Sequence, residues 1–162
     1  MSEPSSAEKQ LFLDMAIAEA VRGARAGQGG PFGAIVVKEG AVIAAAANAV
    51  IANNDPTAHA EVQAIRVACA TLGSFQLDGC DIYASCEPCP MCLGAILWAR
   101  PRALYFAATR ADAAAAGFDD AIFHRMLAGE PGVSPVIREQ LPCDDAGTPF
   151  AVYATLASRV RY

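Results

Sequence analysis

The chain alternates a short strand, a helix and a second strand over residues 81–107, which read DIYASCEPCPMCLGAILWARPRALYFA. Residues 81–84 predict a strand that enters a turn rich in cysteine and proline. From residue 88 to residue 100 the pattern is helical, and Pro101 ends it because proline cannot continue a helix. Residues 103–107 predict the second strand. The alternation indicates an α/β protein.

Elements on either side of this stretch extend the same pattern. They are a helix from a Ser5–Glu8 capping box to about residue 26, a β-hairpin over residues 34–45, a helix from Asp55-Pro56 to Leu72-Gly73, short helices at 111–116 and 121–128, a short strand at 136–137 and a last helix from Thr148. Helices that alternate with buried strands imply a layered sheet with helices on both faces.

Length and charge narrow the class of protein. The 162 residues suit one domain, and 54% hydrophobic residues are enough for one buried core. Twelve Lys and Arg against 17 Asp and Glu give a net charge of -5, which counts against a nucleic-acid partner because such proteins neutralise phosphates. No apolar run approaches the roughly 18 residues of a membrane span, and the N-terminus lacks the features of a signal peptide. We therefore expect a soluble cytoplasmic protein with no membrane partner.

The six cysteines fall into two groups of three. A cytoplasmic chain keeps its thiols reduced, so disulfides are not expected. The scattered group, expected to be small buried side chains, is Cys69, Cys80 and Cys143. The clustered group, whose three-residue spacing indicates metal binding or catalysis, is Cys86, Cys89 and Cys92.

Cys89 and Cys92 open a predicted helix, where residues i and i+3 share one face. Backbone N–H groups and the helix dipole favour their thiolate forms, which bind metal. His59 adds a nitrogen ligand, and three protein ligands with an open fourth position are typical of catalytic zinc. Cys86 is the rival fourth ligand, but it stands before the helix on the incoming strand, and four-cysteine sites normally pair two Cys-x-x-Cys knuckles. The other histidine, His124, has no ligand-like neighbour and is expected at the surface.

Glu61 is the second residue after His59 and lies about 200° round the helix from it, so it is not a natural ligand on the same face. Beside an open metal position it could instead reach a bound water, whose pKa zinc brings to about 7, and carry its proton. A lone glutamate here is more often a solvated residue that favours a helix N-terminus. Together with the three ligands, it predicts a general acid–base.

The sequence His-Ala-Glu at 59–61, followed by Pro-Cys-Pro-Met-Cys at 88–92, is the signature of zinc-dependent nucleobase deaminases. The chain resembles the cytidine-deaminase-like superfamily over nearly all of its length. Four segments are similar, more narrowly, to the small bacterial guanine deaminases: GGPFGA at 29–34, NDPTAHAE at 54–61, SCEPCPMCLGAI at 85–96 and AGFDD at 116–120. Residues from about 129 to 147 carry no matching motif.

The resemblance implies one domain over residues 1–162, folded as a three-layer α/β/α sandwich around a central five-stranded mixed sheet. It implies a hydrolase that converts guanine and water to xanthine and ammonia. One Zn2+ per chain would be held by His59, Cys89 and Cys92, with zinc-bound hydroxide as nucleophile and Glu61 as proton shuttle.

The resemblance also implies a purine pocket and a dimer. The pocket residues would be Phe32, Asn48, Trp98, Asp120 and Tyr162. Tyr162 would close the site of the partner in a homodimer that exchanges the C-terminal segment, about residues 146–162.

Other interpretations of these residues stay open. Guanosine, cytosine or a tRNA adenosine would suit the same chemistry, and a non-catalytic zinc-binding module would keep the scaffold. Phe32 and Trp98 are also typical core residues, and Asn48 is also typical of a turn. Spacing alone does not decide whether Asp119 or Asp120 faces the substrate.

Overall fold

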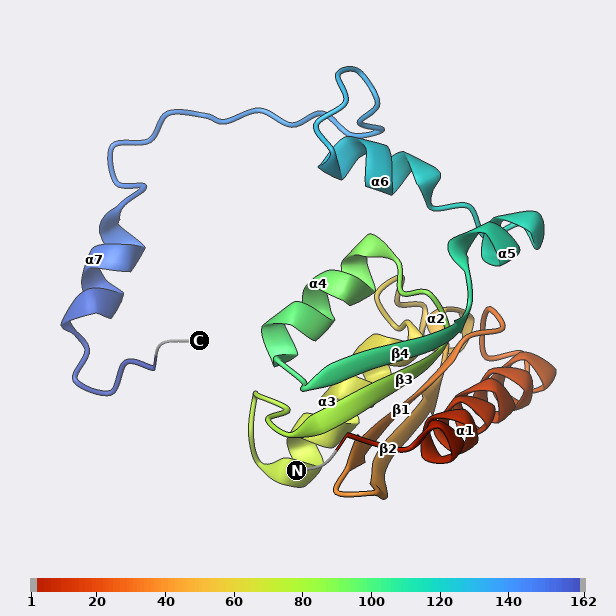
Figure 1. The fold of residues 1–162 in the computed structure, drawn as a ribbon. Coiled ribbons are helices and arrows are strands. Elements are labelled where there is room, and N and C mark those ends of the chain that lie inside the picture. The colour runs from red at the N-terminus through yellow and green to blue at the C-terminus, as the bar shows by residue number, and fades with distance from the viewer. Residues whose placement is uncertain (1–2, 161–162) are drawn as a thin grey trace.

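The computed structural model describes residues 3–160. These residues contain one mixed sheet of four strands (Figure 1). The strands are β1 (Gly33–Lys38), β2 (Ala41–Ala47), β3 (Cys80–Cys86) and β4 (Ala103–Ala108), in the order β2-β1-β3-β4. β1 is antiparallel to both neighbours, whereas β3 and β4 are parallel and are connected through α4 (Pro90–Ala99). The predicted strand–helix–strand stretch is therefore confirmed as a βαβ unit.

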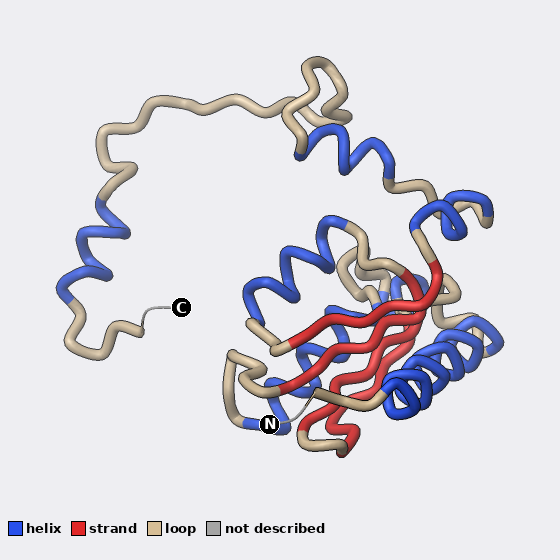
Figure 2. The backbone as a smooth tube through the Cα atoms, in the orientation of Figure 1, coloured by secondary structure: helices blue, strands red, loops and turns tan. Residues whose placement is uncertain are grey.

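Helices cover both faces of this sheet, as the alternation of elements predicts (Figure 2). Successive residues of β1 point to opposite faces. Ile35 and Val37 pack with Phe12 of α1 (Ser6–Arg25) on one side. On the other side, Ala34 and Val36 share a core with α3 (Ala60–Leu72) and α4. The metal-ligand motifs lie on these last two helices.

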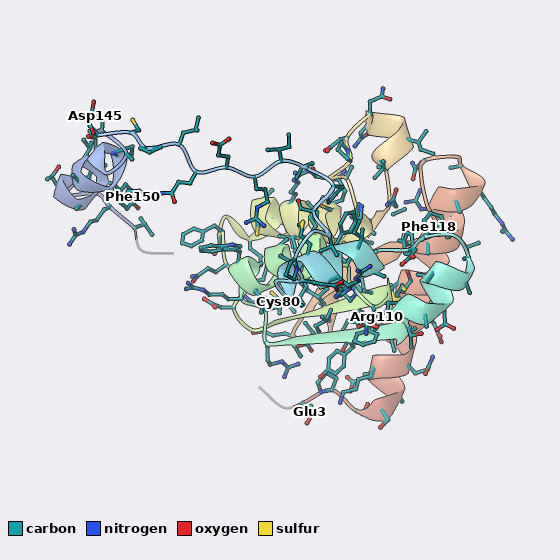
Figure 3. All side chains as sticks on the ribbon, turned by 90° about the horizontal axis from the view of Figure 1, so that it is seen from above. Glu3, Cys80, Arg110, Phe118, Asp145 and Phe150 are labelled. Atoms are coloured by element: carbon teal, nitrogen blue, oxygen red, sulfur yellow. The ribbon has the colours of Figure 1, made fainter. Side chains whose placement is uncertain are left out.

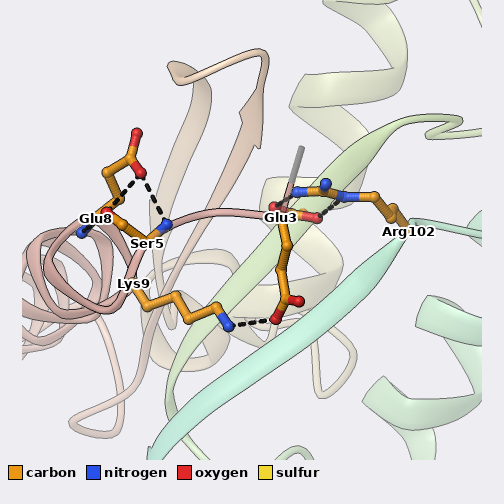
Figure 4. Close-up of polar contacts among 6 residues, drawn as sticks. Glu3, Ser5, Glu8, Lys9 and Arg102 are labelled. Atoms are coloured by element: carbon orange, nitrogen blue, oxygen red, sulfur yellow. Dashed lines mark hydrogen bonds and ion pairs between the residues drawn. The ribbon is translucent and has the colours of Figure 1, made fainter. Parts of the chain in front are cut away.

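The start of α1 follows its sequence signal. Ser5 Oγ accepts a hydrogen bond from the backbone N–H of Glu8 at 3.3 Å, and the Glu8 carboxylate accepts one from the N–H of Ser5 at 2.8 Å (Figure 4). Lys9 also donates to Glu3 at 2.6 Å, which ties the preceding residues to the helix. The predicted capping box and the helix end near residue 26 are confirmed.

The second predicted helix begins later than expected. Asp55-Pro56 is not its start, because the Asp55 carboxylate accepts from both the N–H and the hydroxyl of Thr57 and so closes a turn. α3 instead begins at Ala60 with His59 as N-cap. The short helix α2 (Val50–Asn53), which precedes the turn, is not predicted by the sequence.

The expectation of five strands is wrong for the described residues, 3–160, which form four. Residues 136–137, predicted as a short strand, lie in an extended segment with no assigned strand partner in this part of the chain. A strand needs a neighbour that satisfies its backbone groups, and the segment runs apart from the sheet (Figure 2). β4 is consequently an edge strand.

The last third of the chain leaves the sheet through α5 (Arg110–Ala115) and α6 (Ala121–Leu127). Residues 129–160, called the arm below, then extend to α7 (Thr148–Thr155), which stops short of the predicted end near residue 162. Figure 3 shows Asp145 and Phe150 standing apart from the sheet. Apolar side chains on the arm are exposed, and Ile137 is 96% exposed. The arm thus carries an apolar surface that the rest of residues 3–160 leaves exposed.

All six cysteines belong to the described residues and are free thiols. Cys80 is buried as expected and Cys69 is half-buried, whereas Cys143 is exposed. The expectation of burial is wrong for Cys143 because that residue lies on the arm. Between residues 3 and 160, no helix combines the length and the apolar character needed to span a membrane.

Candidate active site

Two helix N-termini meet and bring three metal-ligating side chains together. His59 is the N-cap residue of α3, Cys89 is the N-cap residue of α4, and Cys92 lies in the first turn of α4. Nδ1 of His59 is 3.6 Å from Sγ of Cys89 and 3.4 Å from Sγ of Cys92. All three ligand atoms lie within 4.8 Å of one another.

These separations fit zinc. With Zn–S near 2.3 Å and Zn–N near 2.0 Å, tetrahedral geometry sets nitrogen and sulfur ligands about 3.5 Å apart. The distances from His59 to the two thiols, 3.6 and 3.4 Å, agree with that value. Three protein ligands leave the fourth position for water or substrate. The three residues are therefore positioned to bind one zinc ion, as the sequence predicts.

The two thiols differ in their affinity for a proton. The pKa of Cys89 is lowered to about 4 by the hydrogen bond from Cys92 and by His59. The pKa of Cys92 is raised, because this thiol donates to Cys89 and is buried. The contact with Cys89 also raises the pKa of His59. Since metal ligands must be deprotonated, zinc binding is expected to displace the proton of Cys92.

Glu61 lies in the first turn of α3 and is only 7% exposed. Its Oε2 is 3.4 Å from Sγ of Cys92, so its carboxyl lies beside the three ligands. Burial raises the pKa of Glu61. A buried carboxyl that holds its proton more readily than usual, next to a metal site, is suited to proton transfer.

The turn between β3 and α4 is bound to the start of α5. The Cys86 thiol donates to the carbonyl oxygen of Thr109 at 3.5 Å, so it turns toward the end of β4 and lies outside the ligand group. Glu87 donates its N–H to Ala108 at 2.8 Å and accepts from the N–H of Arg110 at 3.1 Å. These bonds fix the position of α5 relative to the metal ligands.

A cavity of about 470 Å³ opens beside His59 and Glu61. Its walls come from the loop before β1, the segment after β2, the turn before α4 and the α5–α6 region. The lining residues are Gly30, Phe32, Asn48, Val50, Ile51, His59, Glu61, Cys86, Glu87, Cys89, Arg110, Ala113, Gly117, Phe118, Asp119, Asp120 and Phe123. Three of the predicted pocket residues, Phe32, Asn48 and Asp120, thus share one cavity with the metal site.

Asn48 is buried, and its side chain is held in place. Its Oδ1 accepts hydrogen bonds from the backbone N–H groups of Gly30 and Val50, both at 3.2 Å. A Cβ on Gly29 would lie 2.0 Å from this oxygen, so only glycine fits there. With Oδ1 engaged, the amide N–H groups of Asn48 are the part of its side chain that can serve a ligand.

Phe32 forms an aromatic pair with Phe118. Their ring centroids are 5.1 Å apart and their planes are nearly perpendicular, at 85°. This edge-to-face contact joins the loop before β1 to the α5–α6 loop and gives the cavity an aromatic wall. Phe118 belongs to the AGFDD segment but is not among the pocket residues predicted from the sequence.

The two adjacent aspartates have different contacts. Asp119 Oδ1 accepts from the N–H of Ala121 at 2.9 Å and so caps α6. Asp120 Oδ2 is 3.2 Å from Nε2 of His124. The sequence predicts a surface position for His124, whereas in the structure its side chain is half-buried, at 32% exposed. The available signal was the spacing of four residues, which places two side chains on one face of a helix.

Two predicted pocket residues, Trp98 and Tyr162, are not tested in the same way as the other three. Trp98 is 64% exposed on α4 and is not among the lining residues described above. Tyr162 lies outside the described residues. Their predicted contacts with substrate stay predictions.

Residues 6–108 match the family described as the cytidine and deoxycytidylate deaminase zinc-binding region. This span contains all three zinc ligands and Glu61, and it ends at the last residue of β4. The family match thus covers the sheet, α1, α3 and α4.

Matches to individual proteins can extend beyond the family region. The chain is 48% identical over 153 residues to the guanine deaminase of Bacillus subtilis (strain 168), covering 94% of this chain and 98% of that protein. The X-ray structure of guanine deaminase from Bacillus subtilis matches with a TM-score of 0.91 over the same shares of the two chains. The tRNA-specific adenosine deaminase of Agrobacterium fabrum is 46% identical over 102 residues, which cover 63% of this chain and 66% of that protein.

Proposed function

The chain belongs to the cytidine and deoxycytidylate deaminase zinc-binding family, and on this premise we propose that it is a hydrolase that converts guanine and water to xanthine and ammonia. The observation that carries the choice of guanine is the extent of the likeness to the Bacillus subtilis guanine deaminase. A match over 94% of the chain includes most of residues 109–162. Phe118 and Asp120, which line the cavity, lie in that region.

The family region by itself does not choose the substrate. Identity to the tRNA-specific adenosine deaminase, 46%, is nearly as high, but that match covers 63% of this chain. The net charge of -5 also disfavours a tRNA, whose phosphates attract a basic surface. Guanine is therefore the first candidate and a tRNA adenosine the second.

The chemistry follows from the positions of the ligands and Glu61. His59, Cys89 and Cys92 would hold the zinc ion, which would lower the pKa of a water molecule enough for its hydroxide form to attack a purine at neutral pH. Glu61 moves one proton of that water to the ring nitrogen next to C2 of guanine. The water oxygen forms a bond to C2, and Glu61 then moves the second proton to the amino group there, so that the C2–N bond breaks and ammonia leaves. The raised pKa of Glu61 suits a group that takes up and releases a proton in turn.

The cavity can hold a flat purine by its face and by its edges. Phe32 and Phe118 offer aromatic surface for the ring. The Asn48 amide can donate to a ring nitrogen or carbonyl oxygen, and the Asp120 carboxylate can accept from an amino or ring N–H group. Both edge contacts require groups whose orientation is fixed, and the backbone bonds to Asn48 provide this on one side.

An assay of ammonia release tests this function. Guanine, guanosine, cytosine and adenosine are each incubated with the zinc-loaded protein, and deamination of a tRNA adenosine is measured separately. We expect turnover with guanine above all others. Faster release from guanosine, or activity on tRNA alone, would reassign the substrate, and an inert protein would indicate a zinc-binding module.

We further propose that the protein is a homodimer that exchanges the C-terminal segment. The end of the arm is ordered by its own contacts: the Tyr153 hydroxyl donates to the carbonyl of Val160 and accepts from its N–H, and Arg159 donates to Ala154 at 2.6 Å. The apolar surface of the arm and the exposed side chains on α4, including Trp98, could cover each other between two chains. Tyr162 would then close the site of the partner.

Mixed dimers test the exchange. One chain carries Glu61→Gln with an intact arm, and the other keeps Glu61 but lacks Arg161 and Tyr162. If the tail serves the partner's site, co-expression restores activity to about a quarter of the sites, although each variant alone is impaired. If the tail serves its own site or none, the mixture only averages the two variants.

We also propose a cytoplasmic location. A zinc site that depends on the thiolates of Cys89 and Cys92 requires reduced cysteines, and the free thiols of the chain are compatible with a reducing compartment. Fractionation of cells that make the protein would test this.

A further inference from the structure

The N-cap residue of α6 does not use its side chain as an N-cap. Asp120 holds this position, where an aspartate normally accepts from the backbone N–H groups of the first turn. Within residues 3–160 its carboxylate makes no such bond, and Asp119 caps the helix instead, through Ala121. Because Asp119 caps the helix, the Asp120 carboxylate is available to accept hydrogen bonds from other groups.

That carboxylate is held by His124. Nε2 of His124 is 3.2 Å from Oδ2 of Asp120, and the side chains are 32% and 21% exposed. The two residues are four positions apart, so both lie on the same face of α6. The contact leaves Oδ1 of Asp120 with its full capacity to accept, and Oδ2 with part of it.

His124 contacts Asp120 where that aspartate lines two neighbouring cavities. Asp120 lines both the cavity beside Glu61 and a second cavity of about 490 Å³ between α5 and α6. His124 lines only the second of these two. Because His124 contacts Asp120 and does not line the cavity beside Glu61, it can act on that cavity through the Asp120 carboxylate.

Negative charge surrounds the group that His124 holds. The cavity beside Glu61 is also lined by Glu87 and Asp119, whose carboxylates would repel that of Asp120. Arg110 lines both cavities, and Arg125 on α6 is paired with Glu130. A donor fixed behind Asp120 opposes rotation of its carboxylate away from the purine.

We propose that His124 is a positioning residue that orients the Asp120 carboxylate toward the purine and thereby sets the affinity for substrate. The inference rests on the proposed function, since it assigns Asp120 rather than Asp119 to the purine edge. A positioning residue of this kind changes KM and leaves the proton transfer at Glu61, and hence kcat, nearly unchanged.

Three single variants test the proposal on the zinc-loaded protein. His124→Ala removes the donor and should raise KM for guanine about fivefold, with kcat and the melting temperature close to those of the wild type. His124→Gln keeps an N–H donor at a similar reach and should restore KM to within about twofold. Arg125→Ala removes the neighbouring side chain of α6 and should change neither constant. A wild-type KM in His124→Ala, or no rescue by glutamine, would overturn the proposal.

A double-mutant cycle separates positioning from a general structural effect. If His124 acts through Asp120, then Asp120→Asn with His124→Ala is no worse than Asp120→Asn alone, whereas independent effects multiply. Calorimetric binding of guanine to zinc-loaded Glu61→Gln, with and without His124→Ala, gives the same comparison without turnover. Failure of the wild type to deaminate guanine contradicts the proposed function, whereas multiplied effects or equal guanine binding in the two calorimetric variants contradict the role of His124.

Discussion

A methyl group at Gly29 should disable the purine pocket without touching the zinc ligands. In Gly29→Ala the new Cβ would lie 2.0 Å from Oδ1 of Asn48 and 3.1 Å from its backbone oxygen. No pair of atoms tolerates the shorter distance, so the Asn48 side chain or the loop must move. Because Asn48 is buried, at 4% exposed, its side chain has little room to turn.

The size of the effect follows from the bonds that Asn48 makes. Displacing Oδ1 breaks its bonds to the N–H groups of Gly30 and Val50. At about 1 kcal/mol net for each bond, the free energy of unfolding falls by about 2 kcal/mol. For a chain of this size the melting temperature then drops by about 4–8 °C. KM for guanine should rise at least about tenfold, since the amide that reads the purine is displaced as well.

Calorimetry and steady-state kinetics measure both effects, and Gly94→Ala is the matched control. Among the described residues, nothing lies within 4 Å of a Cβ on Gly94, which is inside α4. This control should keep KM and keep or raise the melting temperature, because alanine favours a helix. Wild-type KM and melting temperature in Gly29→Ala would refute the account of Asn48.

Three further predictions concern other parts of the chain. Deleting Arg161 and Tyr162 should keep the zinc content and the fold but lower guanine turnover at least about tenfold, or roughly 1.4 kcal/mol in the barrier; full activity would show that the tail takes no part. Metal analysis should find one zinc per chain, and active protein with far less zinc would contradict the ligand assignment. Burial raises the pKa of Tyr83 to about 12, so its contribution to stability is complete below the unfolded pKa of about 10 and is lost as the pH rises toward 12. Tyr83→Phe should therefore lose less stability than the wild type above pH 10. At pH 7 the variant should be as stable as the wild type, because the Tyr83 hydroxyl is buried with no hydrogen-bond partner in the described chain. A large drop in its stability at pH 7 would contradict this.

Local signals predicted the sheet and the zinc centre well. The capping box at Ser5, the alternation over residues 81–107 and the spacing of Cys89 and Cys92 each depend on a few neighbouring residues. His59 comes from a distant segment, but the chemistry of zinc limits which side chains can complete two thiolates. Residue type and spacing were sufficient for these features.

Features that depend on other segments, or on competition between neighbouring side chains, were predicted less well. The strand expected at residues 136–137 has suitable side chains but no assigned neighbour within residues 3–160. Asp55 followed by Pro56 is typical of a helix start, but the Asp55 carboxylate accepts hydrogen bonds from the N–H and the hydroxyl of Thr57 instead. The contact of His124 with Asp120 depends on Asp119 capping α6, a competition between adjacent side chains that spacing does not resolve.

The most direct test of the central claim is guanine turnover by zinc-loaded Glu61→Gln. The amide keeps the shape of the buried side chain but cannot take up and release protons. The account predicts about one zinc per chain, as in the wild type, with turnover lowered at least about a thousandfold, within the range that general acid–base catalysis contributes. Near-normal turnover in the zinc-loaded variant would contradict it, because the proton would then be carried by another group.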